Sequence, residues 1–426
     1  MQFRETAPLS LEIKVKKMED EGMKMEDLHT VGTYQRFPIK IVRGQGALVY
    51  DEQGREYIDL SGGYGVAIVG HANPDVARAI AKQAEMLITC HSSLYNDSRE
   101  RYLRVLLTAL PSNLTRVYFC NSGAEANEAA IKFARKSTGR RNVVAFTGSY
   151  HGKTYGALSA TWNQKYKKPF EPLLEGFKFA PFGDLEKSRE LIDENTAAVI
   201  VEPIQGESGI HISPDGFLEG LSKLCREKGA VLIFDEVQSG FGRTGKIWAC
   251  ENWGVTPDIL TASKGIAGGV PFAFAAMSES VSSVLKPGEH TSTFGGNPLS
   301  CAAGHAALTF LLKSGVLANA LETGGYFKQK LESLRSGHPS LVREVRGIGL
   351  MTAVELKIPV KEVIMQGFEH GLILLYSGLN ILRFLPPLVI TKEQVDRVVE
   401  GIDDILSKLE NNSPMNRSAE KLSAEV

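Results

Sequence analysis

The central part of the chain alternates short apolar runs with segments whose apolar residues recur at helical spacing. The runs are "VYF" before Cys120, "VVAF" (143–146), "AAVIVEPI" (197–204) and "AVLIFDEV" (230–237), and amphipathic stretches such as 124–137 and 215–228 lie between them. Buried parallel strands are typically continuous apolar runs, and helices usually connect them. The pattern therefore predicts an α/β domain with a mainly parallel sheet, whose strand ends are the usual place for ligands.

The two ends of the chain show different patterns. The segment "GALVYDEQGREYIDLSGG" predicts a hairpin with Gln53-Gly54 at its turn. Beyond about residue 310 the pattern becomes helix, strand, helix, with "LVREVRGIGLMTAVEL" and "ILRFLPPLVI" as candidate strands. We therefore expect a large central domain and a smaller α+β domain built from both chain ends. The expected boundaries are 1–75 and 311–410 for the small domain, 76–310 for the large domain, and 411–426 for a polar, disordered tail.

Composition narrows the class of protein. A chain of 426 residues is long enough for two subdomains, and 43% hydrophobic with 23% charged residues is ordinary for a globular protein. The net charge of −1 gives no basic field for nucleic acid or an anionic membrane. The five cysteines show neither metal-ligand nor disulfide spacing, the N-terminus has no apolar signal segment, and no apolar run has membrane-spanning length. We expect a cytoplasmic protein without nucleic-acid, membrane or metal partners.

The stretch "FTGSYHGKT" ends like the phosphate-binding loop of an ATPase. Such a loop needs four residues between its first glycine and Gly-Lys-Thr, because backbone N–H groups must surround the phosphate. Gly148 and Gly152 enclose only three residues, and two of these are the bulky Tyr150 and His151. An ATP site is therefore disfavoured, and the remaining interpretation is a strand end that runs into a loop.

Two charged side chains follow apolar runs at expected strand ends. Asp235 ends "AVLIFD", where a buried carboxylate needs a cationic partner, and Arg243 is one candidate. Lys264 follows another apolar run and precedes a glycine cluster, which would let backbone and ligand approach closely. A lysine in such a place can lose its proton and attack a carbonyl group, although most lysines in turns are simply exposed.

A third feature is the helix start in "CNSGAEANEAAIKFARK". Free N–H groups at Gly123 and Ala124 form either an anion site or merely a capped helix. Taken together, the three features suit a phosphate at a helix start, an aldehyde within reach of a lysine, and a ring cation facing a carboxylate. Pyridoxal phosphate carries these three groups, so the sequence predicts pyridoxal phosphate as the cofactor.

Six motifs then occur in order: "NSGAEANEAA", "SYHGKT", "VEPIQGESG", "FDEVQSGFGRTG", "SKGIAGGVP" and "STFGGNPL". On these motifs the chain resembles the class III aminotransferases of the ornithine and acetylornithine type over roughly residues 30–410. The resemblance implies pyridoxal-phosphate fold type I, with a large domain and a smaller α+β domain. It also implies a homodimer that uses an amino donor and 2-oxoglutarate.

The resemblance further implies how the cofactor is held. Lys264 would join the cofactor aldehyde as a Schiff base and move the reacting proton, and Asp235 would keep the pyridine nitrogen protonated. The other implied cofactor contacts are Ser122, Gly123, Ala124, Tyr150 stacked on the ring, Gln238 at the ring hydroxyl, and Thr293 from the neighbouring subunit.

The same resemblance implies a set of substrate contacts. Arg383 in "LRFLPP" would bind an α-carboxylate with its planar fork. Glu207 in "QGESG" would pair with Arg383 while an ω-amino donor is bound, and would swing away for 2-oxoglutarate. Ser292 would lie near the substrate. Lys153 stands where the family usually has arginine, so it keeps the charge that binds a substrate carboxylate but loses the fork.

Within the family, the chain is most similar to the acetylornithine branch and its archaeal and thermophile members. In that group a small acidic carrier protein masks the donor's α-amino group. The implied reaction moves the terminal amino group of an α-amino-blocked ornithine or lysine, carrier-linked or acetylated, to or from 2-oxoglutarate in lysine or arginine biosynthesis. The lysines of "NQKYKK" (Lys165, Lys167 and Lys168) would either dock the carrier or form a solvated face.

Other functions stay open at this point. A 4-aminobutyrate or other ω-amino acid aminotransferase is the main alternative, and Gly295 argues mildly against it because those enzymes usually have alanine there. A pyridoxal-phosphate-binding regulator belongs to another class of protein, and the sequence offers no N-terminal DNA-binding module for it.

Overall fold

The computed structural model describes residues 25–34, 36, 37 and 39–411, and these residues fall into two units that divide between Ile41 and Val42. In the described part of the first unit, α2 (Met25–His29) is a short helix, and the Arg36 guanidinium pairs with Asp27. The second unit carries the sheets and the candidate site.

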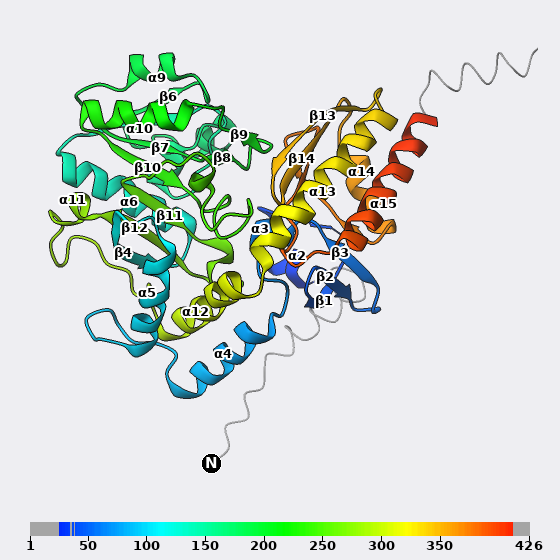
Figure 1. Cartoon of the computed structure of the whole chain (residues 1–426), viewed down its shortest axis with the longest axis horizontal. Helices are drawn as coiled ribbons and strands as arrows, with labels where there is room; N and C mark the ends of the chain where they lie inside the picture. Colours follow the sequence, from blue (N-terminus) through cyan, green and yellow to red (C-terminus); the bar gives the residue numbers. More distant parts are fainter. Residues whose placement is uncertain (1–24, 35, 38, 412–426) are drawn as a thin grey trace, which may run out of the picture. The chain divides into compact units, whose positions relative to one another are not determined.

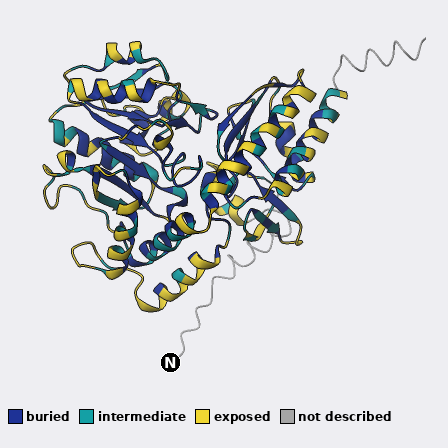
Figure 2. Ribbon diagram, viewed as in Figure 1, coloured by how far each residue is buried: buried dark blue, intermediate teal, exposed yellow. Residues whose placement is uncertain are grey.

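A seven-stranded sheet in the order β4-β12-β11-β10-β7-β5-β6 forms the centre of the second unit (Figure 1). Its strands are β4 (Leu114–Cys120), β5 (Asn142–Phe146), β6 (Phe177–Ala180), β7 (Thr196–Val201), β10 (Val231–Asp235), β11 (Ile259–Ala262) and β12 (Ala273–Ser278). Pairing is parallel except where β12 meets β11 and β4. β7 and β10 are buried at every position (Figure 2), which explains their continuous apolar runs. The predicted mainly parallel α/β sheet is confirmed.

Helices cover this sheet at the places where the sequence shows helical spacing. α6 (Gly123–Thr138) packs across β4, β7, β10, β11 and β12, and α10 (Phe217–Lys228) packs on β7 and β10. The predicted helices 124–137 and 215–228 therefore agree with the structure within two residues at each end. The other helices of this part are α3 (Gly62–Gly65), α4 (Pro74–Met86), α5 (Asp97–Ala109), α7 (Tyr155–Ala160), α8 (Gln164–Lys167), α9 (Leu185–Leu191), α11 (Glu279–Ser282), α12 (Pro298–Lys313) and the 3₁₀ turns η1 (Lys168–Phe170), η2 (Ala249–Asn252) and η3 (Lys264–Ala267).

Strands from both chain ends share one of the smaller sheets. β1 (Ile41–Gln45), β2 (Leu48–Asp51), β3 (Glu56–Asp59) and β15 (Leu372–Ile373) form one sheet, and β13 (Val342–Ile348), β14 (Met351–Leu356), β17 (Ile381–Phe384) and β16 (Leu375–Ser377) form another. β8 (Ile204–Gln205) pairs with β9 (His211–Ile212), and the helices of this part are α13 (Val316–Gly337), α14 (Lys361–Glu369) and α15 (Lys392–Asn411). The predicted hairpin around Gln53-Gly54 is confirmed, because β2 and β3 are antiparallel neighbours.

Two strand predictions need correction. The segment "LVREVRGIGLMTAVEL" forms two antiparallel strands, β13 and β14, that turn at Gly349, where φ is +57°. In "ILRFLPPLVI" the strand ends at Phe384, because Pro386 and Pro387 have no N–H group to continue the ladder. The domain boundaries at 75, 310 and 410 remain predictions, and 412–426 of the predicted tail lie outside the described residues.

Within the part of the chain that the structure describes, no single helix is both long and apolar enough to cross a membrane. Taken together, α12 and α13 are long and apolar enough to do so, but the two helices are bent by 64° relative to each other.

Candidate active site

The carboxyl ends of the central strands surround a cavity of about 340 Å³. This is the position at which open α/β sheets bind ligands. The lining residues come from the start of α6 and from the segments that follow β5, β7, β10 and β11: Gly123, Ala124, Asn127, Tyr150, His151, Gly152, Lys153, Glu202, Glu207, Asp235, Val237, Gln238, Ser263 and Lys264. Eight of the twelve residues predicted from the sequence therefore share one cavity.

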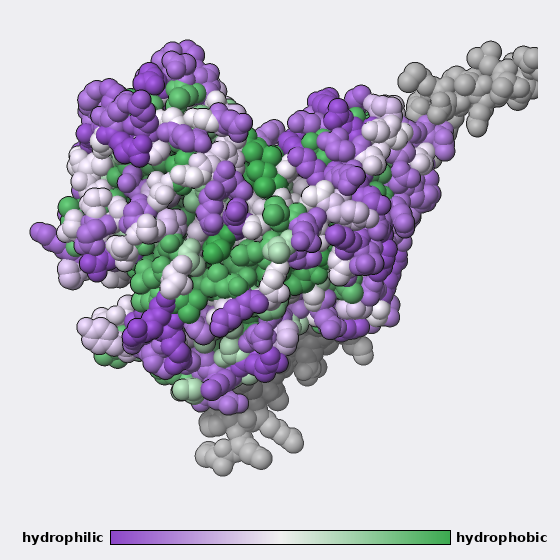
Figure 3. Space-filling view, viewed as in Figure 1, coloured by the Kyte–Doolittle hydropathy of each residue, from purple (hydrophilic) through white to green (hydrophobic). Residues whose placement is uncertain are grey.

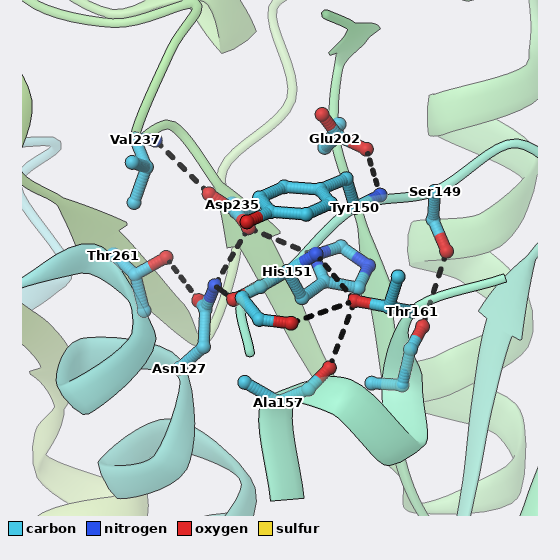
Figure 4. A network of polar contacts seen from close by, with 12 residues as sticks. Asn127, Ser149, Tyr150, His151, Ala157, Thr161, Glu202, Asp235, Val237 and Thr261 are labelled. Carbon is cyan, nitrogen blue, oxygen red and sulfur yellow. Dashed lines mark hydrogen bonds and ion pairs between the residues drawn. The ribbon is translucent and has the colours of Figure 1, made fainter. Parts of the chain in front are cut away.

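Asp235 is the centre of a buried polar network in this cavity (Figure 4). Its Oδ2 accepts a hydrogen bond from Asn127 Nδ2 at 2.7 Å and lies 2.8 Å from His151 Nδ1, and its Oδ1 accepts one from the Val237 N–H at 3.0 Å. Asn127 is itself oriented by the Thr261 hydroxyl, which donates to Asn127 Oδ1 at 2.8 Å. The carboxylate is thus fixed in one orientation at the end of β10.

Arg243 is not the partner of Asp235, contrary to the salt-bridge alternative. Its Nη1 donates to the carbonyl oxygens of Leu350, at 3.1 Å, and Pro386. The side chain is fully buried, and burial lowers its pKa to about 9. A guanidinium that donates to carbonyl oxygens of two distant segments serves the fold and does not pair with Asp235.

Lys264 follows β11 in an unusual backbone conformation. Its φ is +53°, a left-handed value that costs a residue with a side chain about 1–2 kcal/mol. Burial lowers the pKa of the Lys264 ammonium below its usual value, and the charge of Asp235 opposes the shift in part. A lowered pKa increases the fraction of neutral amine, which is the form that attacks carbonyl groups.

The N-terminus of α6 forms one wall of the cavity. Gly123 and Ala124 lie in the first turn of this helix, where backbone N–H groups have no partner within the helix. A Cβ atom on Gly123 would lie 2.7 Å from Val237 Cγ1, so the close approach requires glycine. The Ser122 side chain accepts from the Glu125 N–H at 3.3 Å, so Ser122 caps the helix and does not line the cavity.

Arg383 and Glu207 form an ion pair next to the cavity. Arg383 Nη1 lies 2.9 Å from Glu207 Oε2 and donates to the Gly206 carbonyl oxygen at 3.0 Å. The Tyr376 carbonyl oxygen accepts from Nε and Nη2 of the same guanidinium, at 3.3 and 3.2 Å. Arg383 is 1% exposed, whereas the Glu207 side chain is 31% exposed. Glu207 is therefore the partner with space to move.

Tyr150, Gln238 and Lys153 also line the cavity. Tyr150 forms an edge-on contact with Tyr166, with ring centroids 5.9 Å apart. The exposed Lys153 places its Nζ 4.9 Å from the centre of the Tyr166 ring. The Gln238 Oε1 atom is buried without a hydrogen-bond partner within the protein. A Cβ atom on Gly206 would lie only 1.9 Å from this oxygen, so the close approach requires glycine at position 206.

Ser292 and Thr293 belong to the segment before α12. The Ser292 hydroxyl oxygen accepts hydrogen bonds from Asn121 Nδ2 at 3.2 Å and from the Gly295 N–H at 3.1 Å. Thr293 is exposed and does not line the cavity of its own chain. The four predicted residues outside the cavity lining are thus Ser122, Ser292, Thr293 and Arg383.

Comparison with known proteins identifies the family. The family described as aminotransferase class-III matches residues 31–406. The chain is 44% identical over 399 residues to the LysW-aminoadipate semialdehyde transaminase of Deinococcus radiodurans, covering 93% of this chain and 92% of that protein. It is 42% identical over 391 residues to the acetylornithine aminotransferase of Caldanaerobacter subterraneus, covering 90% and 98%. The chain is a class III aminotransferase.

The resemblance stated from the motifs is thus confirmed, and solved structures agree with it. The ornithine aminotransferase of Toxoplasma gondii matches this aminotransferase with a TM-score of 0.89 at 33% identity, covering 96% of this chain and 100% of that one. The acetylornithine aminotransferase of Elizabethkingia anophelis gives 0.81 at 32%, covering 90% and 97%. Fold type I is confirmed, and the cofactor of the class III aminotransferases is pyridoxal phosphate.

The cavity of this aminotransferase fits that cofactor. The helix start at Gly123 and Ala124 suits a phosphate, and the network around Asp235 leaves one buried carboxylate for a ring cation. Two residues of the cavity lining have a buried polar atom without a hydrogen-bond partner in the protein: Gln238 at Oε1 and His151 at Nε2. Unpartnered buried polar atoms are costly, so a polar ligand in the cavity explains both of them.

Four polar residues in or beside this network are not predicted from the sequence: Asn127, His151, Glu202 and Thr261. Glu202 was detectable, because it follows the apolar run "AAVIV" as Asp235 follows "VLIF". His151 was noticed only as an obstacle to a phosphate loop. Asn127 and Thr261 lie within a helix and a strand, and only the packing of α6 on β11 brings them together.

Proposed function

We propose that this aminotransferase moves the terminal amino group of an α-amino-blocked ornithine or lysine to 2-oxoglutarate. The observation that carries the proposal is the ion pair between Arg383 and Glu207 beside the cavity that contains Lys264. A terminal amine has no carboxylate on the reacting carbon, whereas 2-oxoglutarate has one. An enzyme that takes both substrates in turn needs a carboxylate-binding cation that can also be neutralised.

Glu207 supplies that neutralisation. With a terminal-amine donor in the cavity, the buried Arg383 would be left without a counter-charge if Glu207 were absent, which is unfavourable. With 2-oxoglutarate, the substrate α-carboxylate replaces the Glu207 carboxylate as the anionic partner of the guanidinium. The greater exposure of Glu207 supports movement of this side chain, and the three carbonyl bonds of Arg383 support a fixed guanidinium.

Each cofactor group has a matching residue in this proposal. Lys264 would hold the cofactor covalently through its amine, Asp235 would pair with the ring nitrogen, and Gly123 and Ala124 would bind the phosphate at the start of α6. Tyr150 lies against the ring. The remaining contacts are Gln238 at the ring hydroxyl, Ser122 near the phosphate, and Thr293 from a second copy of the chain.

When bound, pyridoxal phosphate acts as the electron sink for the reaction at the carbon that carries the amine. Lys264 would move the proton at that carbon, and burial lowers the pKa of its ammonium, which increases the fraction of neutral amine that can accept this proton. Asp235 stabilises the positive charge of the ring nitrogen, and Asn127 and His151 keep the carboxylate oriented for this task.

A homodimer belongs to the proposal, because Thr293 does not reach its own cavity. Exposed apolar side chains lie around the segment that carries it: Ile88, Leu94, Tyr95 and Phe294. Residues 88–99 and 295–299 are joined by hydrogen bonds, including Arg99 Nε to the Gly296 carbonyl oxygen at 2.9 Å. Figure 3 shows apolar side chains gathered near the centre of the face that it draws, above the place of α12 in Figure 1. A second copy would cover such a surface and deliver Thr293.

Carrier docking is supported for only part of the predicted lysine cluster. Lys167 is buried, donates from Nζ to the Ser159 carbonyl oxygen at 3.2 Å, and lies over the Phe179 ring, so it is not available to a partner. Lys165 and Lys168 are exposed on either side of Tyr166. Because Tyr166 contacts Tyr150 of the cavity, these two lysines lie near the cavity and are suitably placed for an acidic carrier in the cytoplasm.

The test is a panel of amino donors assayed with 2-oxoglutarate. Carrier-linked, N-acetylated and free ornithine and lysine are compared with 4-aminobutyrate by the value of kcat/KM. We expect the blocked ornithine or lysine donors to be preferred. A preference for 4-aminobutyrate, or equal use of free and blocked donors, would contradict the proposed substrate class but not the transaminase chemistry.

A further inference from the structure

A second carboxylate, that of Glu202, lies beside Asp235 in the cavity. β7 and β10 are parallel neighbours with Val201 opposite Phe234, so the residues that follow are adjacent at the strand ends. Both acids are buried, at 5% and 3% exposed. One carboxylate is sufficient to face a ring cation, and a second one next to it costs free energy through burial and repulsion. Glu202 therefore requires an explanation of its own.

The contacts of Glu202 join two functional segments of the backbone. Its Oε2 accepts from the Tyr150 N–H at 3.0 Å, as Figure 4 shows. Its Oε1 accepts from the Gly206 N–H at 3.2 Å. Tyr150 is the aromatic residue of the cavity, and Gly206 precedes Glu207. One side chain thus ties the ring-contacting loop to the loop that carries Glu207.

The Gly206 peptide passes this restraint on to Arg383. Its N–H is held by Glu202, and its carbonyl oxygen accepts from Arg383 Nη1 at 3.0 Å. The same Nη1 is 2.9 Å from Glu207 Oε2. When Glu207 leaves, the Gly206 carbonyl is the contact from this loop that remains on Arg383, and its direction depends on Glu202.

Glu202 is also able to change its protonation near neutral pH. Burial raises its pKa to about 7, the charge of Asp235 adds to the shift, and His151 opposes it. The charged or titratable groups that face it lie on the loop after β5, the loop after β7, the end of β10, the turn after β11 and β17: His151, Glu207, Asp235, Lys264 and Arg383. An ionised carboxylate accepts both N–H bonds, whereas a protonated one has a single full acceptor oxygen.

We propose that Glu202 is a positioning residue that holds the Gly206 peptide, and thereby Arg383, in the geometry that receives a substrate carboxylate. The inference rests on the proposed role of Arg383 and Glu207 as an exchangeable pair. Glu202 fixes the backbone so that only the Glu207 side chain has to move. It acts on the acceptor, 2-oxoglutarate, and not on the chemistry at Lys264.

The experiment measures the affinity of the holoenzyme dimer for glutarate, an unreactive dicarboxylate, by calorimetry, and the kinetics of both half-reactions. In Glu202→Gln the amide oxygen accepts one N–H and the NH₂ group opposes the other. We expect glutarate to bind about tenfold more weakly, the loss of one charge-assisted hydrogen bond. KM for 2-oxoglutarate should rise by a similar factor, while kcat and the cofactor absorption maximum stay close to those of the wild type.

The pH profile of glutarate affinity distinguishes a positioning role of Glu202 from a simple effect of its charge. In the wild type, glutarate affinity should fall as the pH drops through about 7, because protonation of Glu202 releases one N–H bond. This component should be missing from Glu202→Gln. Glu202→Asp, which keeps the charge but cannot span both N–H groups, should bind weakly at every pH and serves as the second variant if Glu202→Gln fails to fold.

A matched control is Glu236→Gln. Glu236 is also buried, accepts from the N–H groups of Ala249 at 2.9 Å and Cys250 at 2.7 Å, and burial raises its pKa to about 7, but it does not line the cavity. Glutarate affinity should be unchanged in this variant. An equal loss in Glu236→Gln and Glu202→Gln would show a general effect of disturbing the strand ends, and would overturn the proposal.

Arg383→Lys distinguishes failure of this inference from failure of the proposed function. If Arg383→Lys weakens glutarate binding and Glu202→Gln does not, Glu202 is not a positioning residue and the proposed function stands. If neither variant changes glutarate binding, the proposed role of Arg383 is wrong and this inference falls with it. Tighter glutarate binding in Glu202→Gln would mean that Glu202 merely repels carboxylates, and would also overturn the proposal.

Discussion

Glu207→Gln is the substitution that addresses the proposed exchange at Arg383 most directly. In the wild type, Glu207 Oε2 lies 2.9 Å from Arg383 Nη1, and a substrate carboxylate must displace it. A hydrogen bond between charged groups contributes about 1.5–3 kcal/mol, and the partial exposure of Glu207 favours the lower value. Removing a competitor of about 1.5 kcal/mol should strengthen 2-oxoglutarate binding roughly tenfold.

The effect on the donor half-reaction should be opposite in sign. Without Glu207, Arg383 is left as a buried charge with carbonyl contacts only, and a blocked donor offers it no carboxylate at the reacting carbon. We therefore expect the donor half-reaction to slow while the 2-oxoglutarate half-reaction gains in kcat/KM. The assay follows the cofactor absorbance of the holoenzyme in single turnovers with each substrate alone.

Glu355→Gln provides a matched control for this prediction. Glu355 also pairs with a buried arginine, Arg346, at 3.0 Å, and it lies in β14 outside the cavity. The ratio of the two half-reaction rates should stay at the wild-type value in Glu355→Gln and shift by roughly ten- to a hundredfold in Glu207→Gln. A ratio within twofold of the wild type in Glu207→Gln would refute the exchange at Arg383.

Four further outcomes follow from the site and from burial. Lys264→Ala should abolish turnover, and borohydride reduction of the wild type should fix the cofactor to Lys264, as peptide mass analysis would show. Asp235→Asn should retain cofactor but lower kcat by at least about a hundredfold, because a neutral ring is a poor electron sink. Lys153→Ala should raise KM for 2-oxoglutarate roughly tenfold while Lys153→Arg has little effect, and loss of cofactor from Lys153→Ala would contradict this. Burial raises the pKa of Glu236 from 4.5 to about 7, so between these two pH values the folded protein keeps a proton that the unfolded chain has lost. The contribution of Glu236 to stability therefore falls as the pH rises from about 4.5 to about 7. Glu236→Gln should flatten this part of the curve of Tm against pH.

The sequence alone indicated a mainly parallel sheet and the ends of its central strands. β7 and β10 are buried at all positions and are apolar except at Thr196 and Asp235, so their runs are readable without a structure. Asp235 and Lys264 were predicted because a charged residue directly after such a run is placed at the ligand-binding edge of the sheet. Gly123 was predicted from the helix start, and the structure adds that the Val237 side chain leaves no space for a Cβ there.

Only the tertiary structure decided which polar groups meet. Arg243 was a possible partner of Asp235 on sequence distance, yet its guanidinium reaches carbonyl oxygens at Leu350 and Pro386. Lys167 was one of three similar lysines, and the fold buries it over an aromatic ring. Glu202 became adjacent to Asp235 through the register of two strands that are about thirty residues apart in the chain. Spacing along a chain reports the local period of a helix or a strand, whereas side-chain partners depend on strand order and register, and these are fixed by packing over the whole sheet.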